Sequence, residues 1–196
     1  KAKFLSNFIP MLFKISKLVL DEFDFDDLGT SAVPGRIAIY DSRNLVIVSL
    51  CNQNRLVFID TNSLEYKGKL NKDDGIYCPK GIKVRNGNIY VALSKDREED
   101  YGDDRGKSAV AIIEPNDNDI STWDVSHLSV APKGAEEVAV DAENNRFWLL
   151  NHSKLRYVDS EGNSSEKSSK GIEYRNIQYS KGMNKLVLLT RDGAES

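Results

Sequence analysis

The segment Gly81–Leu93 reads GIKVRNGNIYVAL, two apolar strands of alternating pattern on either side of a turn that contains Asn and Gly. Three further segments follow the same plan: Arg36–Leu50 (RIAIYDSRNLVIVSL), Glu137–Leu150 (EVAVDAENNRFWLL) and Asn176–Leu189 (NIQYSKGMNKLVLL). One turn asparagine from each segment marks the spacing, and Asn44, Asn88, Asn144 and Asn184 lie 44, 56 and 40 residues apart. The chain is therefore built from a repeat of about 40–45 residues.

More strand-like sequence follows each pair. These additional segments are Arg55–Asp60, Leu64–Leu70, Ala109–Glu114, Asp119–Val125, Leu155–Asp159 and a polar, Ser-rich stretch after it. Four short antiparallel strands per repeat are typical of one blade of a β-propeller. We therefore predict an all-β fold, a β-propeller or part of one with about four blades. The residues expected in its core are Ile82, Val84, Ile89, Val91, Val138, Val140, Phe147 and Leu149.

The repeats divide the chain into an N-terminal apolar segment, residues 1–33, and propeller repeats over residues 34–196. We expect blades at about 34–70, 79–126, 132–168 and 171–196, of which the last is incomplete because it shows only two strands. An incomplete blade exposes a sheet edge. Either the N-terminal segment supplies the missing strands through Met11–Phe25 and closes a small ring, or a further stretch of chain or a second polypeptide closes a larger one.

Two hexapeptides carry a resemblance to known repeats. Pro79–Val84 (PKGIKV) and Gly87–Ala92 (GNIYVA) resemble the repeat of NHL- and YVTN-type propeller proteins, and Asn52–Leu56 (NQNRL) is similar to the linker into the third strand of that repeat. The resemblance implies propeller architecture over about residues 34–190. Because propellers serve many functions, it implies no particular activity.

Composition excludes some classes of function. The net charge is −3, and no cluster of Lys and Arg interleaved with aromatic residues is present in the sequence, so we expect no nucleic-acid partner. The most apolar stretch, Phe4–Leu20, is interrupted by Pro10, Lys14 and Lys17. It therefore falls short of the ~20 apolar residues that a membrane span requires, and we expect packed structure there, with a membrane-surface element as the alternative.

Catalytic motifs are sparse. The sequence has two histidines, His127 and His152, without the spacing of a zinc site, and it has no Gly-x-Ser-x-Gly motif. The acidic runs Asp21–Asp27 and Glu98–Asp104 lack the spacing of a calcium-binding loop and are expected to be solvated. We therefore predict no catalytic residue, no cofactor and no metal.

The function that we expect is a non-enzymatic scaffold that binds a protein partner through the loops at one end of the blades. The partner-binding candidates in those loops are Asn52, Gln53, Tyr77, Lys80, Lys133 and His152. One alternative is a metal-dependent enzyme similar to lactonase or hydrolase propellers, with Glu136 or Glu137 and Asn151 on the loops around the axis. Another is a structural module of a larger assembly.

Two features concern the compartment. Cys51 follows the second strand of one blade and Cys78 precedes the first strand of the next, so the pair is either a disulfide or two buried thiols. Asn151 and Asn163 each begin an Asn-x-Ser sequon, so a secreted chain could be a glycoprotein with N-linked glycans at these positions. A cytoplasmic or nuclear location remains open beside a secreted one, with a slight preference for the former.

Overall fold

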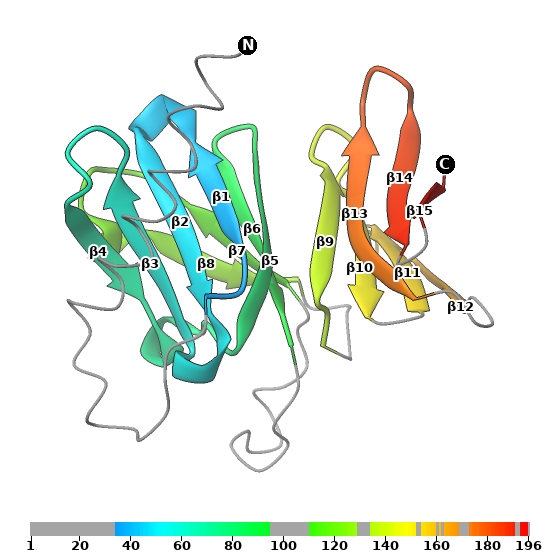
Figure 1. Cartoon of the computed structure of the whole chain (residues 1–196), viewed down its shortest axis with the longest axis horizontal. Helices are drawn as coiled ribbons and strands as arrows, with labels where there is room; N and C mark the ends of the chain where they lie inside the picture. The colour runs from blue at the N-terminus through cyan, green and yellow to red at the C-terminus, as the bar shows by residue number, and fades with distance from the viewer. Residues whose placement is uncertain are drawn as a thin grey trace.

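The computed structural model describes residues 34–94, 110–128, 134–151, 154–159, 161, 163–168, 173–190 and 193–195. Over these residues the chain forms four antiparallel sheets, which follow one another in space in the order of the sequence (Figure 1). The sheets are called blades 1 to 4. The all-β class predicted from the repeats is confirmed. The predicted role of residues 1–33 concerns a segment outside the described residues.

Each blade is a meander in which every strand pairs with the next one along the chain. Blade 1 contains β1 (Ile37–Tyr40), β2 (Leu45–Leu50), β3 (Arg55–Asp60) and β4 (Tyr66–Leu70). Blade 2 contains β5 (Pro79–Arg85), β6 (Asn88–Leu93), β7 (Val110–Glu114) and β8 (Asp124–His127). Blade 3 contains β9 (Glu137–Asp141), β10 (Arg146–Asn151), β11 (Lys154–Asp159) and β12 (Ser164–Ser168). Blade 4 contains β13 (Tyr174–Ser180), β14 (Lys185–Thr190) and β15 (Gly193–Glu195).

The first strand of each blade lies innermost. β1 contacts β5, β5 contacts β9, and β9 contacts β13, so the four first strands form a continuous series around the interior of the arrangement. In Figure 1, β9 stands beside β5 near the middle of the molecule and β13 beside β9. All four of these strands begin at the same end, which we call the axial end.

Asparagines allow the sharp turns between first and second strands. Asn44 and Asn184 have φ values of 53° and 49°, in the left-handed region that Asn tolerates better than most residues. In blade 2 the left-handed residues are Asn86 and Gly87, and Asn88 is already the first residue of β6. In blade 3 the left-handed residue is Asn145 rather than Asn144. The repeat spacing is thus correct, but two of the four marker asparagines lie beside the critical turn position.

Two of the strands differ from the prediction. The strand expected over Asp119–Val125 is instead a 3-10 helix, η6 (Ile120–Thr122), followed by β8. Asp119 is the cause, because its side chain accepts a hydrogen bond from the Ser121 amide and caps the helix. Blade 4, predicted to stop after two strands, has a third, in which Gly193 pairs with Thr190 and Ala194 with Leu189.

Among the described residues, three apolar clusters make up the core, each between neighbouring blades. Phe58 and Trp123 pack edge to face, with ring centroids 5.2 Å apart, between blades 1 and 2. Tyr90 and Phe147 meet between blades 2 and 3, and Trp148 stacks on Tyr179 between blades 3 and 4. Of the eight predicted core residues, seven are buried, and Val84 is partly buried against the first cluster.

Candidate functional site

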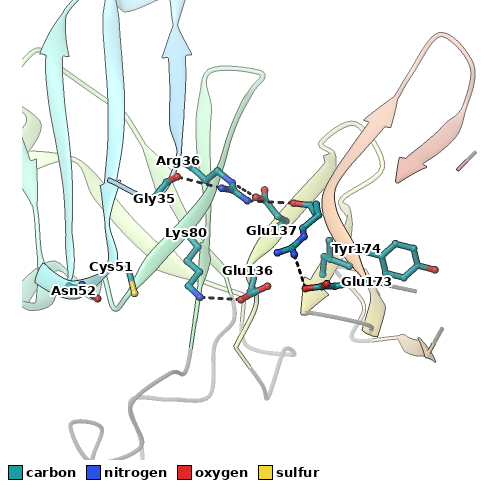
Figure 2. A pocket seen from close by; sticks show the side chains of 11 residues that line it. Gly35, Arg36, Cys51, Asn52, Lys80, Glu136, Glu137, Glu173 and Tyr174 are labelled. Atoms are coloured by element: carbon teal, nitrogen blue, oxygen red, sulfur yellow. Dashed lines mark hydrogen bonds and ion pairs between the residues drawn. The ribbon is translucent and has the colours of Figure 1, made fainter. Parts of the chain in front are cut away.

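A pocket of about 430 Å³ lies at the axial end (Figure 2). All four blades contribute to it: Arg36 precedes β1, Lys80 lies in β5, Glu137 begins β9 and Tyr174 begins β13. We call it the axial pocket. Its volume is typical of a site for a small molecule or for one or two side chains of a partner.

Backbone hydrogen bonds between blades fix the lining. The Gly81 amide donates to the Glu136 carbonyl over 2.8 Å, which joins β5 to the segment that precedes β9. The amide of Glu136 in turn donates to the Leu150 carbonyl over 2.8 Å, and that of Ala135 donates to the Leu93 carbonyl over 2.8 Å. Glu136 and Glu137 are therefore held in place by main-chain contacts to both blades 2 and 3.

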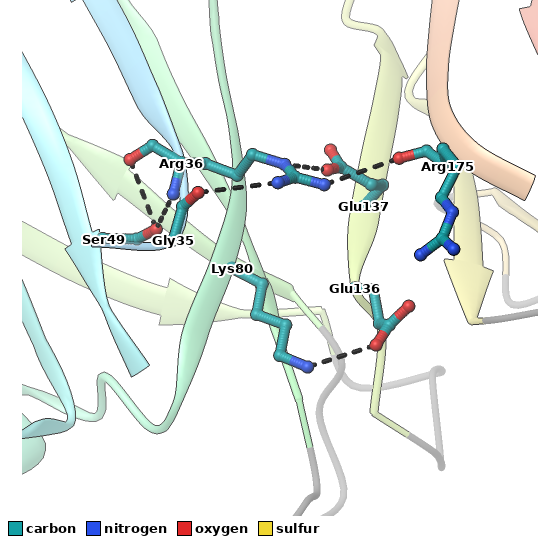
Figure 3. A network of polar contacts seen from close by, with 7 residues as sticks. All are labelled: Gly35, Arg36, Ser49, Lys80, Glu136, Glu137 and Arg175. Carbon is teal, nitrogen blue, oxygen red and sulfur yellow. Dashed lines mark hydrogen bonds and ion pairs between the residues drawn. The ribbon is translucent and has the colours of Figure 1, made fainter. Parts of the chain in front are cut away.

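The charged side chains of the pocket pair with one another. Lys80 Nζ lies 3.1 Å from Glu136 Oε1, and Arg36 forms an ion pair with Glu137 through its Nε. Figure 3 shows both pairs crossing between blades. A third pair joins Arg175 and Glu173 of blade 4, with Nη2 and Oε1 3.1 Å apart. Six charged groups from distant parts of the chain thus meet in one place.

Arg36 connects three blades. Besides the bond to Glu137 in blade 3, its Nη1 lies 3.5 Å from the Gly35 carbonyl and its Nη2 lies 3.5 Å from the Arg175 carbonyl in blade 4. Its backbone amide donates to Ser49 Oγ over 2.8 Å, and Ser49 is fully buried. The guanidinium group is therefore positioned by the backbone of blade 1 and by the carboxylate of Glu137.

Lys83 adds a cation on the inner strand β5. Burial lowers the pKa of Lys83 from its usual value, and the charge of Glu137 opposes that effect. The positive charges of Arg85 and Arg36 lower the pKa further. Lys83 thus lies within electrostatic reach of the same carboxylate that Arg36 contacts.

The predicted partner-binding residues are partly gathered here. Asn52, which is exposed, and Lys80, which is partly buried, both line the axial pocket. Gln53 lies beside Asn52 in the 3-10 helix η3 (Cys51–Gln53), and Tyr77 lies two residues before β5; both are partly buried. Lys133 and His152 lie outside the described residues. The other histidine, His127, ends β8, with its Nε2 2.8 Å from the Gly75 carbonyl.

Cys51 and Cys78 are joined by a disulfide. It links the turn after β2 to the residue that precedes β5, and Cys51 also lines the axial pocket. The sequon asparagines differ in environment. Asn163 is exposed, whereas Asn151 is partly buried and its Nδ2 donates to the Gly134 carbonyl over 3.0 Å.

Glu136 and Glu137 face cations at the axial end, while Asn151 donates its amide to Gly134. Within the described ranges, no group of three or more His, Cys, Asp and Glu side chains is arranged to hold a metal ion. In those same ranges, no helix combines the length and hydropathy of a transmembrane segment.

Sequence reasoning missed Arg36, Glu173 and Arg175 as site residues. The available signal was the alignment of the repeats. Each blade has a charged residue at the start of its first strand, either directly before the strand or among its first two residues: Arg36, Lys80, Glu137 and Arg175. The position of a residue within its repeat, rather than any sequence motif, therefore identifies the residues that line the axial pocket.

No protein-family model matches the chain, and no curated protein sequence matches it. Solved structures do resemble it. Hydrazine synthase of Kuenenia stuttgartiensis gives a TM-score of 0.59 at 13% identity, over 80% of this chain and 43% of that one. The β-propeller domain of Cps50 (Swd1) from Myceliophteria thermophila gives 0.56 at 11% identity, over 84% and 53%. Streptogramin B lyase gives 0.53 at 13% identity, over 86% and 55%.

These similar chains are β-propeller proteins, and this chain spans about half of their length. At such low identity the likeness concerns the fold alone. Together with four meander sheets whose first strands lie innermost, it confirms the architecture that the repeats predict. The chain is a β-propeller, or part of one, with about four blades.

Proposed function

We propose that this chain is a non-enzymatic β-propeller scaffold that binds a protein partner through its axial end. The observation that carries the proposal is the axial pocket itself, in which all four blades place polar and charged side chains around one hollow. The exposed Asn52 lies at the same pocket as Lys80, so two of the candidate contact residues share one surface. A rigid sheet framework keeps such a surface pre-organised, which lowers the entropic cost of binding.

The pairing of charges favours binding over catalysis. Lys80 contacts Glu136 and Arg36 contacts Glu137, so the lining carboxylates have cationic partners. A metal-dependent enzyme of the lactonase or hydrolase kind would require Glu136 and Glu137 to exchange those cations for a metal ion. The paired arrangement instead resembles the charged rim around a protein interface, where such groups set orientation and specificity.

The test is selection of binding peptides from a random library displayed on phage. Two variants provide the comparison: Asn52→Arg places a bulky group at the axial pocket, and Asn62→Arg places the same group in an exposed turn at the opposite end of blade 1. We expect the selected peptides to bind wild type and Asn62→Arg equally and to bind Asn52→Arg at least about tenfold more weakly. Equal binding to all three proteins, or failure of the library to yield peptides, would contradict the proposal.

We also propose that a further stretch of chain or a second polypeptide packs between blade 4 and blade 1. Ile37 of β1 and Leu189 of β14 are 37% and 48% exposed. Strand alternation turns both away from the core, because their neighbours Ala38 and Leu188 face blades 2 and 3. Sedimentation of the 196-residue chain should show concentration-dependent association that Leu189→Lys weakens. A monomer at all concentrations, in both proteins, would contradict the packing of a second copy of this chain at that place.

A further inference from the structure

In two of the three ion pairs of the axial pocket the cation is more exposed than the carboxylate that it contacts, and in the third the two side chains are nearly equal. The side chain of Arg36 is 49% exposed, whereas that of Glu137 is 3% exposed. In the Arg175–Glu173 pair the values are 53% and 41%, and in the Lys80–Glu136 pair they are 25% and 28%. A ligand that enters the pocket therefore meets guanidinium groups first, with the carboxylate of Glu137 beneath one of them.

Arg36 also has hydrogen-bonding capacity left over. Its Nε is used by Glu137, but the contacts of its Nη1 and Nη2 to backbone carbonyls are 3.5 Å long, at the outer limit for a hydrogen bond. A guanidinium group offers five N–H donors in a planar fork that matches a carboxylate. The side chain of Arg36 is half exposed and is held in place by Glu137. Its two terminal nitrogens are thus placed to bind the carboxylate of a ligand.

The charges that line the pocket balance in number, since Arg36, Lys80 and Arg175 are matched by Glu136, Glu137 and Glu173. The attraction for an anion therefore depends on position rather than on net charge. The guanidinium group of Arg36 is far more exposed than the carboxylate that it contacts, so an anion that approaches this end of the blades meets Arg36 before it meets Glu137.

We propose that the axial pocket binds the acidic side chains of a peptide segment, with Arg36 and Arg175 as the residues that contact the carboxylate. The inference rests on the proposed function, because it names the chemistry of the partner at the same end of the blades. The pocket volume of about 430 Å³ is sufficient for one or two Asp or Glu side chains.

The probes are three fluorescein-labelled peptides, of six glutamates, six glutamines and six lysines, titrated into the full chain while fluorescence anisotropy is recorded. We expect the glutamate peptide to bind and the other two to bind at least about tenfold more weakly. Raising the salt concentration from 50 to 200 mM should weaken the glutamate peptide further, because its attraction is ionic.

Four variants test whether Arg36 and Arg175 contact the ligand carboxylate. The Arg175–Glu173 pair provides the most discriminating comparison. Arg175→Gln should weaken the glutamate peptide by about threefold to tenfold, whereas Glu173→Gln should strengthen it, because it releases Arg175. A purely structural effect of breaking the pair would shift both variants in the same direction. Arg36→Lys, which retains the charge beside Glu137 but removes the fork, should weaken binding as well. Lys185→Gln removes a cation from the opposite end of blade 4 and should have no effect.

Three outcomes overturn the proposal: equal binding of the three peptides, preference for the lysine peptide, or equal changes in Arg175→Gln and Lys185→Gln. These results are distinguishable from failure of the proposed function. Library peptides that depend on Asn52 but contain no Asp or Glu would preserve partner binding and reject the acidic ligand. If no library peptide binds at all, the proposed function itself fails.

Discussion

The amide of Gly81 donates a 2.8 Å hydrogen bond to the Glu136 carbonyl, and a Cβ at Gly81 would lie 2.6 Å from Glu137 Oε2. The Cα of Glu137 would be only 2.8 Å from the same Cβ. Blades 2 and 3 therefore approach so closely at the axial end that any side chain at position 81 would force them apart. This contact sets the separation of Lys80 from Glu136 and thus the shape of the axial pocket.

We expect Gly81→Ala to lower the free energy of unfolding by about 1–3 kcal/mol, because the added methyl group overpacks a contact with backbone atoms. Denaturant titration followed by circular dichroism measures the change. Gly182→Ala is the control, since nothing lies within 4 Å of its Cβ position, and it should shift the midpoint little. A Gly81→Ala protein as stable as wild type would mean that the two blades can separate freely.

Val140 is buried between blades 2 and 3, in the cluster that contains Phe147 and Tyr90. Val140→Asp would place an unpaired charge in that cluster, and we expect it to lower the free energy of unfolding by about 3–5 kcal/mol or to prevent folding. Gln178→Asp introduces the same residue at an exposed position of β13 and should be tolerated. The measurement is the thermal midpoint of both variants, and a well-folded Val140→Asp protein would show that the blades do not pack through this face.

Asp141 ends β9 and is buried, with Oδ2 accepting from Asn144 Nδ2 over 2.8 Å and from Arg146 Nε over 3.0 Å. Burial raises its pKa, but the hydrogen bonds from Asn144 and Arg146 outweigh burial, and the pKa lies below the usual 3.8. Since the folded-state pKa is below that of the unfolded chain, the stabilisation is present above about pH 4. It is lost as the pH falls through the folded-state value.

Asp141→Asn should therefore lower the free energy of unfolding by about 1–2 kcal/mol at neutral pH. The variant should also lose less stability than wild type when the pH is lowered below about 4. Urea midpoints measured from pH 7 to pH 2.5 test both statements. Glu114→Gln, at an exposed position at the end of β7, is the control and should reproduce the wild-type profile. Parallel profiles for wild type and Asp141→Asn would contradict the assignment.

The Cys51–Cys78 disulfide closes a loop with a sequence separation of 27. Cross-linking a loop of this length restricts the unfolded chain, and we expect the bond to contribute about 3 kcal/mol. The double variant Cys51→Ser/Cys78→Ser should melt at the same temperature as reduced wild type, below oxidised wild type. Adding reductant should leave the double variant unchanged. Free thiols in the intact native protein, detected by alkylation and mass measurement, would show that the pair is not oxidised in its own compartment.

The two sequons should differ if the chain is expressed in a secretory host. The side-chain amides of both asparagines donate hydrogen bonds, Asn163 to Asp159 and Asn151 to Gly134, but Asn163 is exposed between β11 and β12 whereas Asn151 is partly buried at the end of β10. We expect glycan at Asn163 and little at Asn151, because a glycan replaces one amide hydrogen and needs an open approach. Peptide mapping after enzymatic glycan removal distinguishes the sites, and Asn163→Gln is the matched variant. Full occupancy at Asn151 alone would contradict the expectation.

Local sequence determined the strands and their turns. Alternating apolar residues favour a pleated surface, and Asn or Gly between them permits the left-handed backbone of Asn44, Asn86 and Asn184. These are interactions between near neighbours, so they can be predicted from the order of residues. The prediction was wrong at Asp119, where a side-chain cap competes with strand formation, and at β15, whose three residues pair with β14.

The axial pocket could only be seen in the tertiary structure. Arg36 and Glu137 are 101 residues apart, and no local pattern records that the first strands of blades 1 and 3 converge. Sequence by itself determined that the blades exist and which residues face their neighbours, because those choices depend on period-two alternation. Tertiary structure decided which charges meet, because their positions depend on how closely glycine and main-chain hydrogen bonds allow the blades to approach.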